Sequence, residues 1–577
     1  MEQQSPAVGT MTREAAYALL TSAGQPFELT EVEMFGRRCR AFKHAPPNLR
    51  ELYASTRSEL PFIVYGDQRL SFEAAWQQAC RLAGALHDDY GVRKGDRVAI
   101  SLRNYPEWMI AFCAATSIGA IAVGMNALWQ PHEMEYALNH CGARALFADQ
   151  ERLDRLMACR ERPPGLGVIA VRPAGPLPAG ARGFDEVLAA RARTDRMPPV
   201  DIEPNDDAIM FYTSGSTGHP KGAVSTHRNI LSALLSWELD GYAAVLTGLT
   251  AAPAPDAPQG ATLLGIPLFH VTGLHAVFLS SYRTQRRLVS MYKWDTELAA
   301  ELIERERITS FIAPAAMTGD LVEAARGTGR DLSSLQAIGG GGAARAPEQV
   351  RAIDQVFANA KPATGWGMTE TNAIGTGIGG QTYLDRPESS GRVSVVLDIR
   401  VVDDHGRPLP PMARGELQVR GASVIRGYWN RPDADAATFD GEWLKTGDVA
   451  CIDEDGFLYI VDRLKDLVIR GGENIGCGAV EAALLEHPDV LEASVYGVPD
   501  ARLGEELAAT LHTRVPLSES DLRAFLEPRL AKFEIPRYFH FEPAPLPRIA
   551  SGKILKRQLR EEAAARLASV NSLKSSG

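Results

Sequence analysis

The 577-residue chain has few cysteines, and none of them are paired at the spacing of a metal or redox site. Its seven cysteines are odd in number and include no C-x-x-C pair. This argues against a disulfide framework or a zinc site and is typical of a reducing compartment. Basic residues are also outnumbered by acidic ones. The chain has 61 Lys and Arg and 71 Asp and Glu, which gives a net charge of −10. That balance disfavours nonspecific binding to nucleic acid or to an anionic membrane.

Long apolar runs are scarce as well. The N-terminal segment mixes acidic and basic residues and lacks the apolar core of a signal peptide. One stretch, 108–130, has no charged residue over a length that could span a bilayer. Its Ala, Gly, Thr and Ser content instead favours a buried helix (about 108–119) followed by a buried strand (about 120–125), with a membrane span as the alternative. We expect a cytoplasmic enzyme without an integral membrane segment.

Helix-like and strand-like segments alternate over residues 71–150 and again from about 206 to 380. This alternation predicts α/β layers around a largely parallel sheet. Residues 245–261 are rich in Ala, Pro and Gly and predict a surface loop. After Pro387 short strands and polar turns predict a small β-rich subdomain. The chain from about 464 onward is long enough for a separate small α+β domain.

Residues 213–222 (TSGSTGHPKG) combine small hydroxylated residues, glycines and one lysine. Glycine lets the backbone approach a ligand closely, and a run of N–H groups forms an anion-binding concavity. The motif therefore predicts a phosphate-binding loop, with a flexible surface loop as the alternative. It differs from G-x-x-x-x-G-K-[ST], because Lys221 follows Pro220 and precedes Gly222.

Four further stretches suggest nucleotide chemistry. In 364–371 (TGWGMTET), Trp366 lies between glycines and could stack on a purine, and Glu370 is a hard oxygen ligand suited to Mg²⁺. Four glycines at 339–342 predict a close approach of the backbone to a ligand, with a tight turn as the alternative. Asp448, after a predicted strand, is a natural partner for ribose hydroxyls. Lys553, in 546–555 (LPRIASGKIL), could neutralise charge that develops between a carboxylate and a phosphate. Residues 375–380 match G-x-G-x-x-G but lie outside a βαβ context, so we reject a dinucleotide site.

Taken together and in this order, the motifs resemble the signatures of the adenylate-forming superfamily, which includes acyl-CoA synthetases, luciferases and peptide-synthetase adenylation domains. The resemblance extends over about residues 50–560. It implies an α/β fold with stacked sheets in a large N-terminal domain (1–462) and a small β-barrel-like subdomain. A hinge (463–466) would then lead to a mobile α+β C-terminal domain (467–577) that carries the catalytic lysine.

The resemblance also implies roles for residues of this chain. Lys553, Lys221, Glu370 and His270 would be catalytic, and Thr213 and Glu370 would hold Mg²⁺. Lys465 would be the hinge, Gly471 and Gly472 would line the coenzyme A channel, and Phe269, His270 and Trp237 would border the acyl group. The nucleotide would meet Thr213, Ser214, Gly215, Ser216, Thr217, Gly218, Lys221, Gly342, Ala343, Ala344, Gly365, Trp366, Gly367, Met368, Thr369, Asp448, Arg463 and Lys553.

Two positions differ from the usual family pattern. Most relatives have Tyr where Trp366 stands, so stacking would be kept and a phenol hydrogen bond lost. Ala344 replaces the usual proline after the glycine run.

The implied reaction is two-step. A carboxylic acid and Mg·ATP give an acyl-adenylate and pyrophosphate, and the thiol of coenzyme A then displaces AMP. The region around 229–241 and 264–273 is apolar, with Asp240 as its only aspartate. It favours a medium- or long-chain fatty acid, or else a bulky cyclic or aryl-alkanoic acid, over an amino acid.

Three alternatives remain open at this stage: a ligase that loads an acyl-carrier protein, a luciferase-like oxygenase and a nonenzymatic nucleotide sensor. The expected partners are small molecules, the acid and coenzyme A, with a homodimer as one open arrangement.

Overall fold

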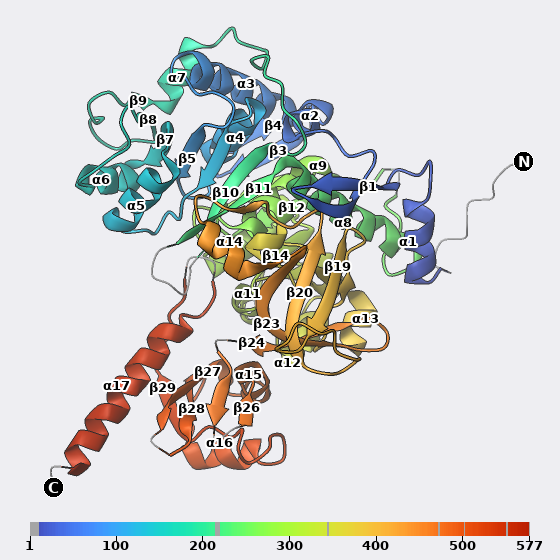
Figure 1. The fold of residues 1–577 in the computed structure, drawn as a ribbon, viewed down its shortest axis with the longest axis vertical. Helices are drawn as coiled ribbons and strands as arrows, with labels where there is room; N and C mark the ends of the chain where they lie inside the picture. Colours follow the sequence, from blue (N-terminus) through green and yellow to red (C-terminus); the bar gives the residue numbers. More distant parts are fainter. Residues whose placement is uncertain are drawn as a thin grey trace, which may run out of the picture.

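The computed structural model describes residues 11–213, 220–254, 256–342, 345–464, 466–470, 473–500, 502–549 and 552–575. Within this range the fold is mixed α/β, with a large N-terminal domain and a small C-terminal domain. Figure 1 shows the large part at the top and the small part below it, with the long helix α17 (Lys556–Ser575) running outward. No helix in the described ranges is both long and apolar enough to cross a bilayer.

An eight-stranded sheet forms one half of the large domain. Its order is β21-β11-β10-β6-β5-β7-β8-β9, and all neighbours from β10 to β9 are parallel. The central strands are buried on both faces and are almost wholly apolar, as parallel strands between helical layers must be. The strands are β5 (Arg97–Ser101), β6 (Ile121–Gly124), β7 (Ala145–Asp149), β8 (Gly167–Val171), β9 (Arg182–Gly183), β10 (Asp207–Thr213), β11 (Lys221–Thr226) and β21 (Gly427–Tyr428).

A nine-stranded sheet forms the other half, in the order β18-β17-β16-β15-β14-β12-β13-β3-β4. The strands from β3 to β16 in this order are parallel, and β4, β17 and β18 add antiparallel edges. Its strands are β3 (Pro61–Tyr65), β4 (Gln68–Ser71), β12 (Ala261–Leu264), β13 (Arg287–Ser290), β14 (Ser310–Ala313), β15 (Ala337–Gly340), β16 (Lys361–Thr364), β17 (Thr376–Gly379) and β18 (Arg392–Val393).

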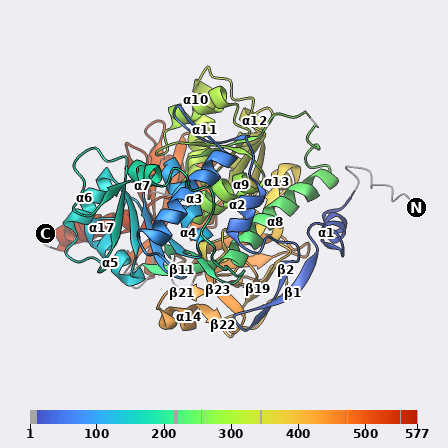
Figure 2. The same ribbon diagram turned by 90° about the horizontal axis from the view of Figure 1, so that it is seen from above.

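Helices separate and cover the two sheets. The largest core cluster joins residues of both sheets to the helices between them, whereas separate clusters join each sheet to its outer helices. Figure 2 shows α3, α4 and α9 in the middle, α5 and α6 on one side, and α10, α11 and α12 on the other. The middle layer contains α2 (Leu49–Ser55), α3 (Phe72–Asp88), α4 (Pro106–Ser117), α7 (Phe184–Ala190), α8 (His227–Leu246), the π-helix η1 (Thr272–Leu279) and α9 (Ser280–Arg283). The outer helices are α5 (Pro131–Cys141), α6 (Gln150–Ala158), α10 (Thr296–Glu306), α11 (Ala315–Gly327) and α12 (Pro347–Val356), and α13 (Gly380–Asp385) contacts β16 and β17.

A five-stranded antiparallel sheet follows, as the short strands after Pro387 predict. It contains β19 (Leu397–Val402), β20 (Gly415–Gly421), β22 (Phe439–Asp440), β23 (Trp443–Ile452) and β24 (Leu458–Arg463), with α14 (Pro432–Thr438) alongside. The N-terminal α1 (Arg13–Thr21) and the hairpin of β1 (Leu29–Met34) and β2 (Arg37–Phe42), which the sequence did not predict, pack on α8 and β20.

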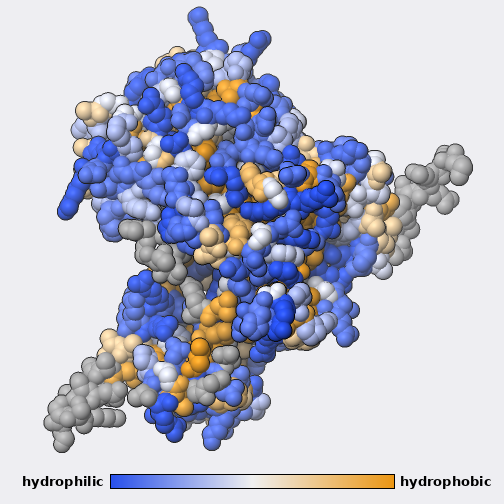
Figure 3. Space-filling view, viewed as in Figure 1, coloured by the Kyte–Doolittle hydropathy of each residue, from blue (hydrophilic) through white to orange (hydrophobic). Residues whose placement is uncertain are grey.

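The C-terminal sheet has its own apolar core. Its order is β26-β25-β28-β27, with β29 parallel to β28. The elements are β25 (Val468–Arg470), β26 (Glu473–Ile475), α15 (Cys477–Leu485), β27 (Val490–Asp500), β28 (Gly504–Thr513), α16 (Glu519–Leu526), β29 (Tyr538–Glu542) and α17. Figure 3 shows a mostly hydrophilic surface with hydrophobic atoms gathered at the waist between the large and small parts.

The α4–β6 unit confirms the prediction of a buried helix and strand at 108–125. The sequence pattern also predicts a helix at 518–531, a strand at 335–338, a strand that ends at His270 and a loop at 375–380, and these boundaries were wrong. The helix ends at Leu526, the first strand runs from Ala337 to Gly340, and the second ends at Leu264. Residues 376–379 form β17, because their glycines permit close antiparallel pairing with β16 and β18.

Candidate active site

The predicted phosphate loop connects two antiparallel strands, β10 and β11, near one edge of the first sheet. Thr213 ends β10, Lys221 begins β11, and the two residues pair across the ladder. The pairing places Thr213, the predicted metal ligand, beside Lys221, the cation predicted to bind phosphate. Ser214, Gly215, Ser216, Thr217 and Gly218 lie outside the described residues.

Tyr428 connects Lys221 to Glu370. Its hydroxyl donates a hydrogen bond of 2.8 Å to Oε1 of Glu370. The Nζ atom of Lys221 lies 4.9 Å from the centroid of the Tyr428 ring, within the range of a cation–π contact. Burial, followed by the charge of Glu370, raises the pKa of Tyr428, so the phenol stays a donor. Glu370 is itself only 7% exposed, and this single phenol therefore fixes a buried carboxylate and supports the lysine.

Trp366, Asp448 and Arg463 form a second group. The indole Nε1–H of Trp366 donates to Oδ2 of Asp448 at 2.8 Å, and Nε of Arg463 lies 2.7 Å from Oδ1. The register of β23 and β24 places Asp448 directly opposite Arg463. Burial raises the pKa of Asp448, and Arg463 and the indole oppose this shift. The carboxylate is therefore held in one orientation by two donors from different parts of the chain.

The segment around Trp366 is shaped by close backbone contacts. A Cβ on Gly365 would lie 2.4 Å from the carbonyl oxygen of Thr376, and one on Gly367 would lie 2.5 Å from that of Ala373. Met368 donates its N–H to Thr371, and Thr369–Thr371 form the 3₁₀ turn η2 that carries Glu370. The two residues after this turn, Asn372 and Ala373, have φ of 58° and 67°. Such strained backbone often accompanies functional sites.

Lys553 lies on a tight hairpin that reaches the second sheet. Its Cε atom is 3.3 Å from the position that a Cβ on Gly342 would occupy, and Gly342 has φ of +83°. A side chain at Gly342 would therefore be both strained and in conflict with the lysine. A Cβ on Gly341 would lie 3.7 Å from the side chain of Thr272 on η1, an ordinary van der Waals contact. Ala343 and Ala344 lie outside the described residues.

The electrostatic surroundings of Lys553 connect the two groups. Partial removal from water lowers the pKa of Lys553, as does Arg463, against the opposing charges of Asp448 and Glu370. The side chain keeps contact with solvent, and water damps this shift. Lys553 is therefore near Asp448 and Glu370, the two acidic residues predicted to bind the nucleotide and its Mg²⁺, although it lies more than 100 positions further along the chain.

His270 and Phe269 lie in the turn before η1. Their rings are 4.8 Å apart, and Phe269 is buried. Burial, and then the charge of Lys553, lowers the pKa of His270 to about 4, so the imidazole is neutral at pH 7. Its Nε2 atom is buried without a hydrogen-bond partner in the described ranges. The π-helix that follows is a feature frequent at functional sites.

The third predicted acyl residue, Trp237, is half-buried on α8 and packs against two core clusters. Asp240, one turn further along α8, forms a short hydrogen bond with the hydroxyl of Tyr17 on α1. Burial raises the pKa of Asp240, and Tyr17 opposes this shift. Asp240, the only aspartate in 229–241 and 264–273, is thus already hydrogen-bonded to Tyr17. A substrate amine would have to break this hydrogen bond to reach it.

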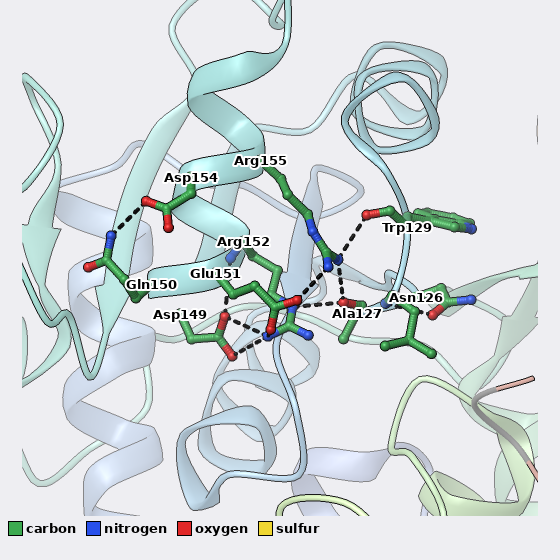
Figure 4. Close-up of polar contacts among 10 residues, drawn as sticks. Asn126, Ala127, Trp129, Asp149, Gln150, Glu151, Arg152, Asp154 and Arg155 are labelled. Carbon is green, nitrogen blue, oxygen red and sulfur yellow. Dashed lines mark hydrogen bonds and ion pairs between the residues drawn. The ribbon is translucent and has the colours of Figure 1, made fainter.

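A network of ion pairs and hydrogen bonds joins α6 to residues 127–129 (Figure 4). The buried Arg152 of α6 pairs with Asp149 at 3.0 Å and donates to the carbonyl oxygen of Ala127 at 2.8 Å. Arg155 donates to the carbonyl oxygens of Ala127 and Trp129. The ring of Trp129 packs edge-on against Tyr212, which precedes Thr213. These contacts hold Trp129 against Tyr212 at the end of β10.

The structure brings Lys221, Glu370, Trp366, Asp448, Arg463, Gly342 and Lys553 into one region, with His270 near Lys553. Lys465, Gly471 and Gly472 lie outside the described residues. Sequence reasoning missed Tyr428, because it lies 58 positions from Glu370 and no local pattern connects them.

The donor set suits a magnesium nucleotide more than a protein-only metal centre. No group of three or more His, Cys, Asp or Glu side chains able to hold a metal occurs in the described ranges. Mg²⁺ usually takes one or two carboxylates together with phosphate oxygens. Glu370, with one oxygen engaged by Tyr428, fits that mode, as does the hydroxyl-bearing Thr213 at the loop.

Comparison with known proteins decides the family. The AMP-binding enzyme model matches residues 51–429, and the AMP-binding enzyme C-terminal domain model matches 479–553. The chain belongs to the AMP-binding enzyme family. It is an AMP-forming acyl-CoA synthetase, and the relatives described below carry the names of CoA ligases or CoA synthetases.

Three relatives illustrate the range of the family. The chain is 32% identical to the long-chain-fatty-acid–CoA ligase FadD13 of Mycobacterium tuberculosis, over 86% of this chain and 93% of that protein. It resembles the anthranilate CoA ligase AuaEII in complex with anthranoyl-AMP, with a TM-score of 0.81 and 25% identity over 91% and 98% of the two chains. It also resembles the o-succinylbenzoate CoA synthetase of Bacillus subtilis in complex with ATP and magnesium, with a TM-score of 0.72 and 29% identity over 89% and 99%.

Proposed function

We propose that this synthetase joins a hydrophobic carboxylic acid to coenzyme A in two half-reactions. In the first, an acid oxygen attacks the α-phosphorus of ATP, and the bond to the departing pyrophosphate breaks. In the second, the sulfur of coenzyme A attacks the acyl carbon, the bond to AMP breaks, and the thiol proton is released. Both steps are displacements without oxidation or reduction. No nucleophilic side chain is needed, because a substrate atom is the nucleophile in each step.

The observation that carries the proposal is the position of Lys553. It reaches Gly342 from the C-terminal hairpin, among Asp448, Arg463 and Glu370. Negative charge builds up between an attacking carboxylate and the α-phosphate, and a preorganised cation lowers that barrier. His270, neutral at pH 7, adds no charge of its own beside it.

The other residues hold the nucleotide. Thr213 and Lys221 would bind phosphates at the loop end of the β10–β11 hairpin, and Glu370 with Thr213 would hold Mg²⁺. When bound, the ion neutralises phosphate charge. Asp448 would accept hydrogen bonds from ribose hydroxyls, since a carboxylate has lone pairs beyond those that Trp366 and Arg463 occupy. Trp366 would pack against the base.

A fatty acid, or else a bulky cyclic or aryl-alkanoic acid, is the proposed substrate. The residues proposed to border the acyl group are Phe269, Trp237 and the apolar helices α8 and η1. Asp240 is bonded to Tyr17 and is not available to a substrate amine. FadD13 carries the name of a long-chain-fatty-acid ligase and AuaEII that of an aromatic-acid ligase, and both classes therefore belong in the test.

A panel of acids tests the proposal. Purified protein is mixed with ATP, Mg²⁺ and each acid, and pyrophosphate release is followed with and without free coenzyme A. We expect release with hydrophobic acids and thioester only when coenzyme A is present. Adenylate formation without any thioester would instead favour loading of a carrier protein. Absence of acid-dependent pyrophosphate release with every acid would refute the proposal.

A further inference from the structure

The hairpin that presents Lys553 is closed by backbone hydrogen bonds. Ile549 donates to the carbonyl oxygen of Lys553 at 2.8 Å, and Leu555 donates to that of Pro547 at 2.8 Å. Arg548 bridges Ile554 on the opposite strand. Arg548 is thus five residues before Lys553 in the same hydrogen-bonded hairpin, so a contact that holds Arg548 also restrains the lysine.

One side of α11, in the large domain, faces this hairpin. A Cβ on Gly552 would lie 3.3 Å from the side chain of Met317, and Gly552 has φ of +84°. Nη1 of Arg548 lies 3.3 Å from Oδ2 of Asp320. Nη2 of Arg514, at the end of β28, lies 3.0 Å from Oε2 of Glu323. Met317, Asp320 and Glu323 are spaced three apart, so they occupy the same side of the helix.

Asp320 is the central residue of these contacts. The same Oδ2 atom accepts a hydrogen bond of 3.0 Å from the indole of Trp294, which fixes the carboxylate before Arg548 arrives. On its other side Arg548 pairs with Glu492 of β27. The side chains of Arg548 and Asp320 are 19% and 31% exposed, against 50% and 42% for Arg514 and Glu323. Better-shielded pairs interact more strongly, so the Asp320–Arg548 pair dominates.

We infer that Asp320 is a positioning residue that stabilises the C-terminal domain in the orientation for adenylation, through Arg548. The inference rests on the proposed two half-reactions. A contact present in only one of two orientations shifts the equilibrium toward that orientation by its own free energy. The resemblance to the adenylate-forming superfamily implies that the C-terminal domain turns about the hinge for thioester formation, so that Lys553 leaves and the Asp320–Arg548 pair breaks. Loss of the pair would therefore slow the first half-reaction selectively.

Asp320→Asn tests the inference in the full-length protein. The amide oxygen can still accept from Trp294, whereas the charge that attracts Arg548 is lost. Single-turnover pyrophosphate release measures the first half-reaction, and thioester formation from preformed acyl-adenylate and coenzyme A measures the second. We expect the first rate to fall about three- to tenfold and the second to stay the same or rise. Asp331→Asn is the matched control, because Asp331 pairs with Arg307 at 2.8 Å in the large domain.

Salt and a second variant separate positioning from folding. Raising the salt from about 0.05 M to about 0.5 M screens exposed charges and should slow the first step of the wild type more than that of Asp320→Asn. Arg548→Gln should show the same selectivity if Asp320→Asn fails to fold. Equal loss in both half-reactions, or no loss in either, would overturn the inference while the wild-type activity stands. A wild type without acid-dependent pyrophosphate release would overturn the proposed function instead.

Discussion

The indole of Trp366 and the carboxylate of Asp448 are joined by a hydrogen bond of 2.8 Å across 82 positions of sequence. The sequence motifs predict separate roles for these residues, base stacking for Trp366 and ribose binding for Asp448. The hydrogen bond makes them one unit, because the aromatic residue also orients the acid. Tyrosine, which the resemblance to the superfamily implies at this position, has its polar atom at a different place on the ring.

Trp366→Phe tests this unit. The ring remains, but Asp448 loses a donor and keeps only Arg463. A hydrogen bond to a charged group contributes about 1.5–3 kcal/mol, so the KM for ATP should rise about tenfold or more, with a smaller effect on kcat. Trp366→Tyr serves as the comparison and should retain more affinity if its hydroxyl reaches Asp448. Unchanged ATP affinity in Trp366→Phe would show that Arg463 alone suffices.

Tyr428 offers a matched pair of substitutions. Tyr428→Phe removes the hydroxyl from Glu370 but keeps the ring beneath Lys221, and Tyr428→Leu removes both contacts. We expect the Phe variant to need several-fold more Mg²⁺ for half-maximal pyrophosphate release, because Glu370 is no longer oriented. The Leu variant should in addition bind ATP more weakly. Identical Mg²⁺ dependence in wild type and Tyr428→Phe would argue against Glu370 as a metal ligand.

His227 predicts a pH dependence of stability. It is fully buried at the start of α8, where its Nδ1 accepts the N–H of Leu49 at 3.1 Å. Burial lowers its pKa to about 3. The unfolded chain binds this proton below about pH 6.5, whereas the folded chain does not until about pH 3. Stability therefore falls as the pH falls through this window, by about 1.4 kcal/mol for each pH unit.

The measurement is the thermal midpoint of wild type and His227→Gln at pH 6.5 and pH 5. The glutamine cannot be protonated, so its midpoint should fall less between the two pH values. Parallel shifts in both proteins would assign the acid sensitivity to other groups, such as the buried His275, whose pKa burial also lowers to about 3.

The parts of the fold that follow local patterns could be predicted from the sequence. The α4–β6 unit is one example, since the Ala, Gly, Thr and Ser content of this charge-free run favours a buried helix and strand over a membrane span. Motif order likewise indicated Glu370, Asp448 and Lys553. Tyr428, Asp320 and Arg548 could not be found in this way, because their partners come from distant segments and their residue types are ordinary on surfaces. The turn that carries His270 was mistaken for a strand end because an apolar run does not show where pairing stops.

Lys553→Ala tests the central claim most directly. Adenylate formation and thioester formation from preformed acyl-adenylate are measured separately in the variant and the wild type. If Lys553 neutralises charge at the α-phosphate and then moves away, the first rate should fall by about 10²-fold or more and the second should be nearly unchanged. Similar losses in both half-reactions, or an unimpaired first step, would contradict the account.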